Sequence, residues 1–249
     1  MTKDLKIISL VPSLTELLVD LGLEENIVGI TKFCVHPKNL RKEKVVVGGT
    51  KNIHLEKIKA LQPDFILCNK EENTKEIVEN CRKIATTHVS DISTIKDILA
   101  LIVNYGILFS CEEKALMLTT KLRDKIKDFK HFVKDKPTLK VVYFIWKNPW
   151  MIAANNTFIH HLLELTKFEN CYKSESRYPE ITLENLKTKE IDVIFLSSEP
   201  FPFKEKNSLD FNNHTNNTSI VLVDGEYFSW YGSRLLKAFD YFKELRKRL

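Results

Sequence analysis

The 249-residue chain lacks long apolar runs. A helix that spans a bilayer needs about 20 consecutive apolar residues, whereas the longest runs here, such as residues 191–196, have the length of a strand. The first residues contain neither an apolar leader region nor a small-residue cleavage site. We therefore expect a soluble protein that does not span a membrane, cytoplasmic as the sequence is written and periplasmic if a leader has been removed.

Cysteine and glycine are also scarce, with 5 and 7 residues. An odd number of widely scattered cysteines indicates free thiols rather than a disulfide framework. The paired glycines Gly48 and Gly49 stand outside any G-x-G-x-x-G or Walker motif, so nucleotide binding is not expected. The H-E-x-x-H and G-x-S-x-G signatures are missing as well, and the sequence predicts no enzyme and no resident cofactor.

Excess charge of one sign is small, because 38 Lys and Arg face 33 Asp and Glu for a net charge of +5. Most of this excess lies in residues 237–249, where cations are favourable at the end of a last helix. A nucleic-acid partner needs a concentrated basic face, so none is expected. The chain is expected to be a monomer.

Short β-rich runs alternate with helical patterns along most of the chain, which indicates an α/β fold. The first block predicts strands at residues 6–11, 27–31, 45–47, 64–68 and 86–89. It predicts helices near residues 17–21, 55–61, 72–83 and 94–109, the first with a capping box at Ser13 to Glu16 and a stop at Gly22. The second block predicts strands at 139–146, 191–197 and 219–223 and helices at 157–165 and from about Gly232.

Residues 112–133 separate these blocks and predict one helix of roughly 33 Å, since they contain no Gly or Pro and repeat apolar residues at helical spacing. The expected organisation is an N-terminal lobe at 1–110, a rigid bridging helix at 111–136 and a C-terminal lobe at 137–249. Residues 55–71 also align without gaps on residues 183–199, at an offset of 128. Two similar lobes or a chance likeness would both explain this, and two lobes would place a ligand cleft between them.

Polar and aromatic residues gather in loops that follow predicted strands, where binding groups usually sit. Cys34 and His36 are two residues apart and could reach one metal ion, or could be a packed thiol and a loop imidazole. Glu71 and Glu72 could cap the following helix. Trp146 and Trp150 follow a strand and either close a core or form a ligand platform.

The segment from Asp224 to Arg234 is expected to be a loop, and it holds Tyr227, Phe228, Trp230 and Tyr231. Four aromatic side chains are hard to bury together in a loop. The segment therefore predicts a ligand or partner surface that includes Trp230.

Several phrases of the sequence resemble one known family. They are residues 8–13 (ISLVPS) with Thr15 and Glu16, residues 55–64, residues 33–37 (FCVHP), residues 48–52 (GGTKN) and the long central helix. Nearly the whole chain resembles the helical-backbone metal receptors, which include periplasmic binding proteins for vitamin B12 and ferric siderophores. The resemblance implies two α/β lobes joined by one rigid helix and a solute-binding protein that delivers a metal chelate to an ABC importer permease.

The resemblance also implies binding residues. Phe33, Trp146 and Tyr178 match family positions whose aromatic side chains pack on a corrinoid, and Glu226 matches an acidic position near the last helix. The chain departs from the pattern at Asn69 and near Thr50, where relatives have aromatics, and this weakens the corrinoid assignment. Polar contacts are expected from Asn69, Glu226 and Lys51, and cobalt or iron ligation from Cys34 or His36 is a further possibility. The permease-docking glutamates fall at Glu56 and Glu184, which could equally be ordinary first-turn residues.

Two other functions remain open at this stage. A cytoplasmic enzyme or chaperone of metal-tetrapyrrole or corrinoid salvage could use the same fold, because fold does not fix function. A ligand-free interaction module would also fit an aromatic segment buried against another chain.

Overall fold

The computed structural model describes residues 5–211, 213–215 and 218–249. The chain divides into two compact units. Unit 1 contains the residues up to Arg123 together with Tyr231–Leu236, and unit 2 contains Asp124–Trp230 together with Lys237–Leu249. The chain therefore passes between the units three times. Residues 1–4, on which the expectation about a leader partly rests, lie outside the described residues.

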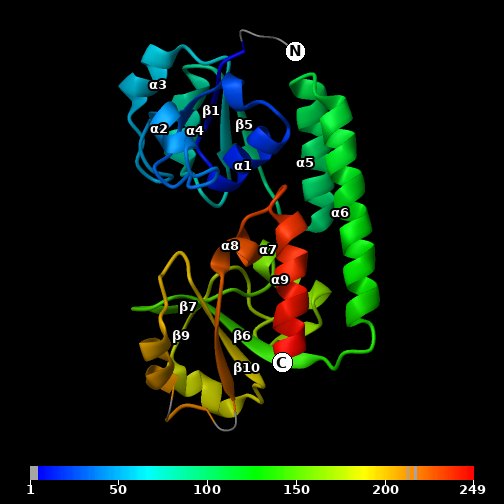
Figure 1. The fold of residues 1–249 in the computed structure, drawn as a ribbon. Helices are drawn as coiled ribbons and strands as arrows, with labels where there is room; N and C mark the ends of the chain where they lie inside the picture. Colours follow the sequence, from blue (N-terminus) through cyan, green and yellow to red (C-terminus); the bar gives the residue numbers. More distant parts are fainter. Residues whose placement is uncertain (1–4, 212, 216–217) are drawn as a thin grey trace. The chain divides into compact units, whose positions relative to one another are not determined.

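Unit 1 is built on a parallel sheet in the order β3-β2-β1-β4-β5 (Figure 1). The strands are β1 (Ile7–Ser9), β2 (Ile27–Ile30), β3 (Val45–Val46), β4 (Phe65–Asn69) and β5 (Thr86–Ser90). A core of fully buried side chains, including Ile8, Ile66 and Ile58, packs against this sheet. Because every strand runs the same way, the loops that leave their carboxyl ends meet at one edge.

The helices of unit 1 are mostly those that the sequence predicts: α1 (Pro12–Asp20), α2 (Leu40–Glu43), α3 (Leu55–Leu61), α4 (Lys75–Arg82) and α5 (Ile95–Leu108), with a 3-10 turn η1 (Glu24–Asn26). The predicted capping box at Ser13 is wrong, because Pro12 already stands in the first turn and Val11 is the N-cap, without a side-chain bond. The predicted stop at Gly22 is confirmed: this residue has a φ of 77°, which glycine adopts without strain.

Unit 2 has a mixed sheet in the order β11-β10-β6-β7-β9, with β8 paired to β6. Its strands are β6 (Leu139–Trp146), β7 (Trp150–Ile152), β8 (Phe168–Asn170), β9 (Glu180–Ile181), β10 (Val193–Ser197) and β11 (Ser219–Val223). The pairs of β6 with β8 and β10, and of β10 with β11, are parallel, whereas β7 is antiparallel to β6 and β9. The sequence did not predict the short strands β7, β8 and β9.

The helical segments of unit 2 are α7 (Phe158–Leu165), α8 (Gly225–Ser229) and the 3-10 segments η2 (Leu183–Thr188) and η3 (Glu205–Phe211). Two longer helices, α6 (Glu112–Val133) and α9 (Leu235–Arg248), each contain residues of both units. The bounds predicted for α6 are confirmed, while the last helix begins three residues later than Gly232. Within unit 2, Phe129 of α6 packs 5.3 Å from Phe239 of α9 between ring centroids.

The two sheets share one connected pattern. Strands β2-β1-β4-β5 of unit 1 and β8-β6-β10-β11 of unit 2 are neighbours in the same order, and all of their pairs are parallel. The aligned segments found in the sequence are α3 with β4 and η2 with β10. The internal repeat is therefore structural, although the second copy of the helix is 3-10. None of the helices in the described part of the chain is long and apolar enough to cross a membrane.

Candidate functional site

The carboxyl edge of the sheet in unit 1 gathers four of the predicted ligand residues. Phe33 follows β2, Thr50 and Lys51 follow β3, and Asn69 ends β4. The Phe33 side chain is 48% exposed, whereas Thr50 is buried. The Lys51 ammonium donates to the carbonyl oxygen of Glu71 over 2.6 Å, which joins the loops after β3 and β4. The parallel topology thus brings together residues from three separate parts of the sequence.

Asn69 is buried and uses its amide to shape the loop after β4. Its Nδ2 donates to the carbonyl oxygen and the Oγ of Ser90, over 3.0 and 3.2 Å. Its Oδ1 accepts the backbone N–H groups of Glu71 and Glu72, over 2.8 and 3.2 Å. Asn69, where the resemblance implied an aromatic residue, therefore organises this edge of the sheet through its amide.

The sequence allowed Glu71 and Glu72 to cap α4, but neither residue does so. Thr74 is the N-cap, and its hydroxyl oxygen accepts from the backbone N–H of Ile77 over 3.2 Å. Glu72 is partly buried instead, and burial raises the pKa of its carboxyl, an effect that the Lys51 charge and a Thr50 hydrogen bond reduce. The site of unit 1 therefore holds a carboxyl whose charged form is penalised.

The segment Tyr231–Leu236 completes unit 1 from the far end of the sequence. Tyr231 is buried with its hydroxyl 3.1 Å from Ser90 Oγ, and burial raises the pKa of this phenol well above its ordinary value. Arg234 holds the Glu16 carboxylate with two bonds, Nε to Oε2 over 2.7 Å and an Nη2 bond to Oε1 over 3.0 Å. Sequence reasoning missed both contacts, because no local pattern connects residues so far apart.

For Cys34 and His36 the sequence allows either a metal pair or a packed thiol beside a loop imidazole. Cys34 is fully buried, and its Sγ lies 3.1 Å from Thr15 Oγ1 and 3.3 Å from Thr31 Oγ1. Burial raises the pKa of this thiol, which disfavours the thiolate that a metal needs. His36 is partly buried. The contacts of Cys34 suit packing, and no cluster of three or more His, Cys, Asp or Glu side chains that could hold a metal occurs among the described residues.

Aromatic side chains border the carboxyl edge of the sheet in unit 2. Trp146, at the end of β6, is 38% exposed, and its ring lies 5.8 Å from that of Phe201 in an edge-on contact. Trp150 is partly buried against the core and stacks on Phe203 at 6.1 Å. Of these two tryptophans, Trp150 therefore packs against the core, and Trp146 stays exposed, so that its role as a ligand platform remains a prediction.

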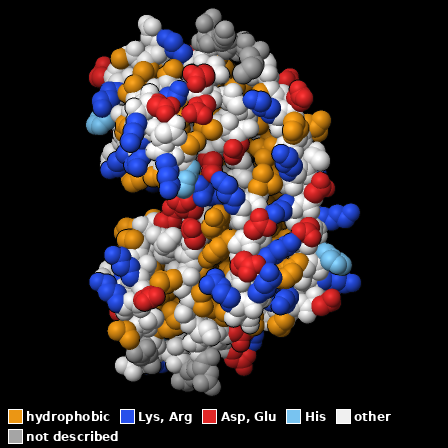
Figure 2. Space-filling view, viewed as in Figure 1, with side chains coloured by type: hydrophobic (Ala, Val, Ile, Leu, Met, Phe, Trp, Pro, Cys, Tyr) orange, Lys and Arg blue, Asp and Glu red, His pale blue; other side chains and the backbone are white. Residues whose placement is uncertain are grey.

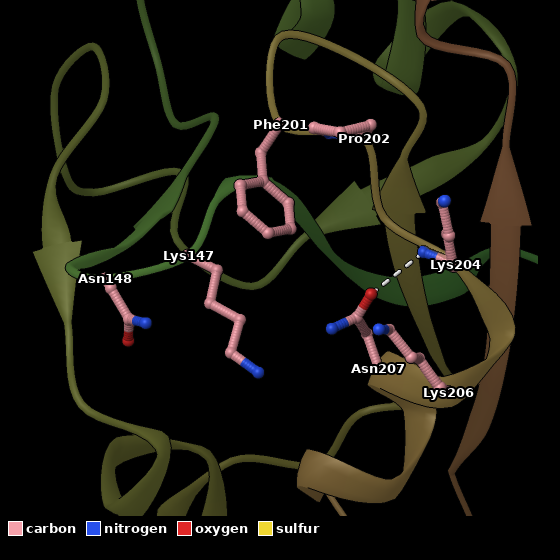
Figure 3. Close-up of a pocket in the computed structure, with 7 residues that line it drawn as sticks. All are labelled: Lys147, Asn148, Phe201, Pro202, Lys204, Lys206 and Asn207. Atoms are coloured by element: carbon pink, nitrogen blue, oxygen red, sulfur yellow. Dashed lines mark hydrogen bonds between the residues drawn. The ribbon is translucent and has the colours of Figure 1, made fainter.

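A pocket of about 350 Å³ opens beside this aromatic group, between the loops that follow β6 and β10 (Figure 3). Its lining is basic, amide-bearing and apolar: Lys147, Lys204, Lys206, Asn148, Asn207, Phe201 and Pro202. The backbone N–H of Lys204 donates to Asn207 Oδ1 over 2.9 Å, and this bond joins the end of the loop after β10 to η3, which carries Lys206. The pocket has the volume of a small-ligand site.

The prediction that the segment from Asp224 to Arg234 is a loop is wrong, because the segment contains helix α8. Helical spacing lets Phe228 enter the core and Tyr227 stack on Tyr241 at 4.8 Å, and Trp230 is buried with its Nε1 donating to Glu199 Oε1 over 2.9 Å. The segment is therefore not an exposed aromatic surface. The ligand role predicted for Trp230 remains a prediction.

Two other predicted ligand residues of unit 2 are half-buried. Glu226 lies in the first turn of α8, where a helix N-terminus favours an acidic side chain. Tyr178 lies beside Arg177, whose guanidinium is 5.9 Å from its ring. Their binding roles remain predictions.

Comparisons with known proteins agree with this arrangement. The sequence matches the periplasmic binding protein family over residues 7–216, which include the whole sheet of unit 1 and every strand of the sheet of unit 2 except β11. The chain belongs to the periplasmic binding protein family.

Three individual relatives illustrate the range of this periplasmic binding protein family. The chain is 24% identical to a vitamin B12-binding protein of Pectobacterium atrosepticum, over 94% of this chain and 85% of that protein. It is 25% identical to YvrC of Bacillus subtilis, an uncharacterized ABC transporter substrate-binding lipoprotein, over 71% of this chain but only 58% of that protein. A periplasmic haem-binding protein of Pseudomonas aeruginosa has the same fold, with a TM-score of 0.84 at 16% identity over 96% and 91% of the two chains.

The two predicted docking glutamates of this periplasmic binding protein occupy equivalent places in the repeat. Glu56 is in the first turn of α3 and Glu184 in the first turn of η2. Their side chains are 86% and 63% exposed. Each carboxylate pairs with a lysine three residues later, Lys59 over 2.8 Å and Lys187 over 2.7 Å. Both glutamates are exposed and so accessible to a partner. Figure 2 shows that basic and acidic side chains are interspersed over the face that it draws.

Proposed function

We propose that this periplasmic binding protein is the solute-binding component of an ABC importer and that its solute is a metal chelate, a corrinoid or a ferric siderophore. The observation that carries the proposal is the pair of exposed aromatic side chains at the carboxyl edges of the two sheets, Phe33 and Trp146, in a chain of this family. A flat aromatic surface supplies apolar contact area to a macrocycle or a chelate shell. The vitamin B12-binding relatives support this solute class.

The protein would bind the chelate without reacting with it. The proposed contact residues are Phe33, Thr50 and Lys51 within unit 1 and Trp146, Tyr178 and Glu226 within unit 2, and Asn69 shapes the edge of unit 1 from within. The metal would arrive as part of the solute, and the protein would work outside the cytoplasmic membrane. Its macromolecular partner would be the importer permease, met through Glu56 and Glu184.

A thermal-shift panel tests the proposal. The unfolding midpoint of the purified chain is measured with cobalamin, cobinamide, haemin and each of several ferric siderophores. In parallel, the solute bound in unheated samples is recovered and its mass is measured by mass spectrometry. A ligand present at about 100 times its Kd should raise the free energy of unfolding by roughly 2.7 kcal/mol. At least one chelate should raise the midpoint and be recovered intact. No shift with any of them excludes the proposed solute class, and a chemically altered chelate points to a salvage enzyme instead.

A further inference from the structure

The pocket of unit 2 carries positive charge that its surroundings neutralise only in part. Lys147 is half-buried and forms an ion pair with Asp210 over 2.6 Å, and its ammonium lies 5.2 Å from the centre of the Trp150 ring. Lys204 and Lys206 are exposed, and neither has an ion-pair partner among the residues that the structure describes. The described lining contains no carboxylate. Two cations at the rim are therefore available to a ligand.

The aromatic wall of the same pocket leads to the predicted ligand surface. Phe201 lines the pocket, and its ring lies 5.8 Å from that of Trp146, which is 38% exposed. An apolar face thus adjoins a cationic hollow within one unit. A neutral chelate would use only the aromatic face, whereas an anionic substituent would gain from the ammonium groups as well.

Recognition of an anion also agrees with how the loop is held. Asn207 is buried and its Oδ1 accepts the backbone N–H of Lys204 over 2.9 Å, so this bond holds the backbone at Lys204 (Figure 3), while the Lys204 and Lys206 side chains are exposed. Fixed backbone reduces the ordering cost of binding. We propose that this pocket takes a carboxylate, phosphate or phenolate group of the bound chelate, so that the protein prefers anionic chelates to neutral ones. This inference rests on the proposed function and names the solute class more narrowly.

The test measures affinity for matched ligands by isothermal titration. Each chelate that bears an anionic group is compared with a counterpart that lacks this group: cobalamin with cobinamide, which lacks the phosphodiester and the nucleotide attached to it, haemin with its dimethyl ester, and a negatively charged ferric catecholate with a neutral ferric hydroxamate. The wild type should prefer the anionic member of a pair that it binds. The double substitution Lys204→Gln and Lys206→Gln should lower the affinity for that member roughly three- to tenfold, as expected for exposed charge pairs. The affinity for the neutral member should stay unchanged.

Two variants serve as controls. Lys204→Arg with Lys206→Arg keeps the charges and should keep the preference. Lys173→Gln with Lys189→Gln removes the same charge from another hollow of unit 2, which also holds Glu169 and Glu190, and should change nothing. Circular dichroism and the unfolding midpoint establish that each variant is folded.

The outcomes separate the two proposals. A wild type that binds chelates without preferring the anionic members, or a glutamine variant that keeps the preference, overturns the anion pocket but leaves the proposed function in place. A wild type that binds none of the chelates overturns both. Millimolar inorganic phosphate should compete with the anionic member alone, and phosphate that binds without displacing any chelate would show that the pocket serves a free anion, against the inference.

Discussion

Glu16 and Arg234 form a buried ion pair although 218 residues separate them. The side chains are only 8% and 5% exposed, and two hydrogen bonds join them. Replacing Arg234→Ala would leave the Glu16 carboxylate in a site where its charge is poorly solvated. We expect the free energy of unfolding to fall by about 3–5 kcal/mol, measured by urea denaturation.

A surface pair provides the matched control. Lys247 and Glu244 are 2.7 Å apart with side chains 55% and 65% exposed, and Lys247→Ala should cost well under about 1 kcal/mol. Replacing Arg234→Met and Glu16→Met together should recover much of the loss, because no lone charge is then left buried. Equal losses for Arg234→Ala and Lys247→Ala would contradict the buried pairing.

Glu72 should make stability depend on pH. Its folded-state pKa is raised mainly by burial, so the folded protein binds a proton that the unfolded chain has already released. The stability of the wild type relative to Glu72→Gln should therefore be highest below the ordinary glutamate pKa and should decline as the pH rises through the raised value. The decline should be roughly 1.4 kcal/mol for each unit of pKa shift, measured by denaturation between about pH 4 and about pH 7.

The neighbouring lysine offers a check on this explanation. The Lys51 charge lowers the pKa of Glu72 and so opposes the effect of burial. In a Lys51→Met background, Glu72→Gln should therefore raise the free energy of unfolding near neutral pH by more than it does in the wild type. A Glu72→Gln protein that is less stable than the wild type at neutral pH would rule out a penalised carboxylate.

Among the elements, α8 depends on a close approach at its first residue. A Cβ atom on Gly225 would lie 2.4 Å from Ser197 Oγ and 2.6 Å from Glu199 Cγ. Gly225→Ala should therefore displace the start of α8 and lower the free energy of unfolding by about 1–3 kcal/mol. Because Trp230 and Glu226 follow in this segment, ligand affinity should fall with it.

A second variant in α8 separates crowding from a lost hydrogen bond. The Ser229 hydroxyl donates to Glu199 Oε1 over 2.7 Å, and Ser229→Ala removes this bond without adding an atom, for about 1 kcal/mol. Chemical denaturation of both variants gives the comparison. A Gly225→Ala protein as stable as the wild type would contradict the prediction and would mean that the loop after β10 moves away from the added methyl group at little cost in free energy.

Elements with a strong local pattern were predictable from the sequence. The apolar spacing of α6 and the continuous run of β6 gave their observed bounds, and Thr94 was placed at the start of α5, where it forms a capping box. The antiparallel strands β7 and β9 were missed, because 3 and 2 residues are too few for a period to be visible. The sequence predicts a loop where α8 lies, because five residues are too few to show a helical period and the many aromatic residues indicate an exposed surface instead.

The candidate site was predictable where topology alone decides it. Phe33 follows β2 and Asn69 ends β4, and because these strands are parallel to β1 the sequence could place both residues at one edge. It could not show that the Asn69 amide is committed to Ser90 and Glu71, because those bonds depend on how the loops fold. The basic pocket went unnoticed for a related reason: Lys147 and Lys204 come from loops whose approach is set by the pairing of β6 with β10.

For the whole molecule, the docking prediction concerns one charge in each unit. Replacing Glu56→Lys and Glu184→Lys should lower solute-dependent ATP hydrolysis by the reconstituted importer roughly tenfold or more, because the new lysines would face the basic permease residues expected to pair with the glutamates, and like charges across an interface slow association and weaken the complex. Solute affinity and stability should change little, since both side chains are exposed. Glu244→Lys, at an exposed position outside the repeat, is the control and should leave the hydrolysis rate unchanged. Full activity of the double variant would show that permease contact uses other residues.

The late position of Arg234 also bears on how the protein is made. Unit 1 holds most of the first half of the chain, but its buried carboxylate at Glu16 gains its partner only after 218 further residues have been joined. At about 5–20 residues per second, a ribosome takes roughly 10–40 seconds to supply them. During that interval the nascent unit 1 lacks both the Arg234 guanidinium, which makes two hydrogen bonds to the Glu16 carboxylate, and the Tyr231 ring. The emerging chain should therefore need shielding from aggregation until its last helix begins to leave the ribosome.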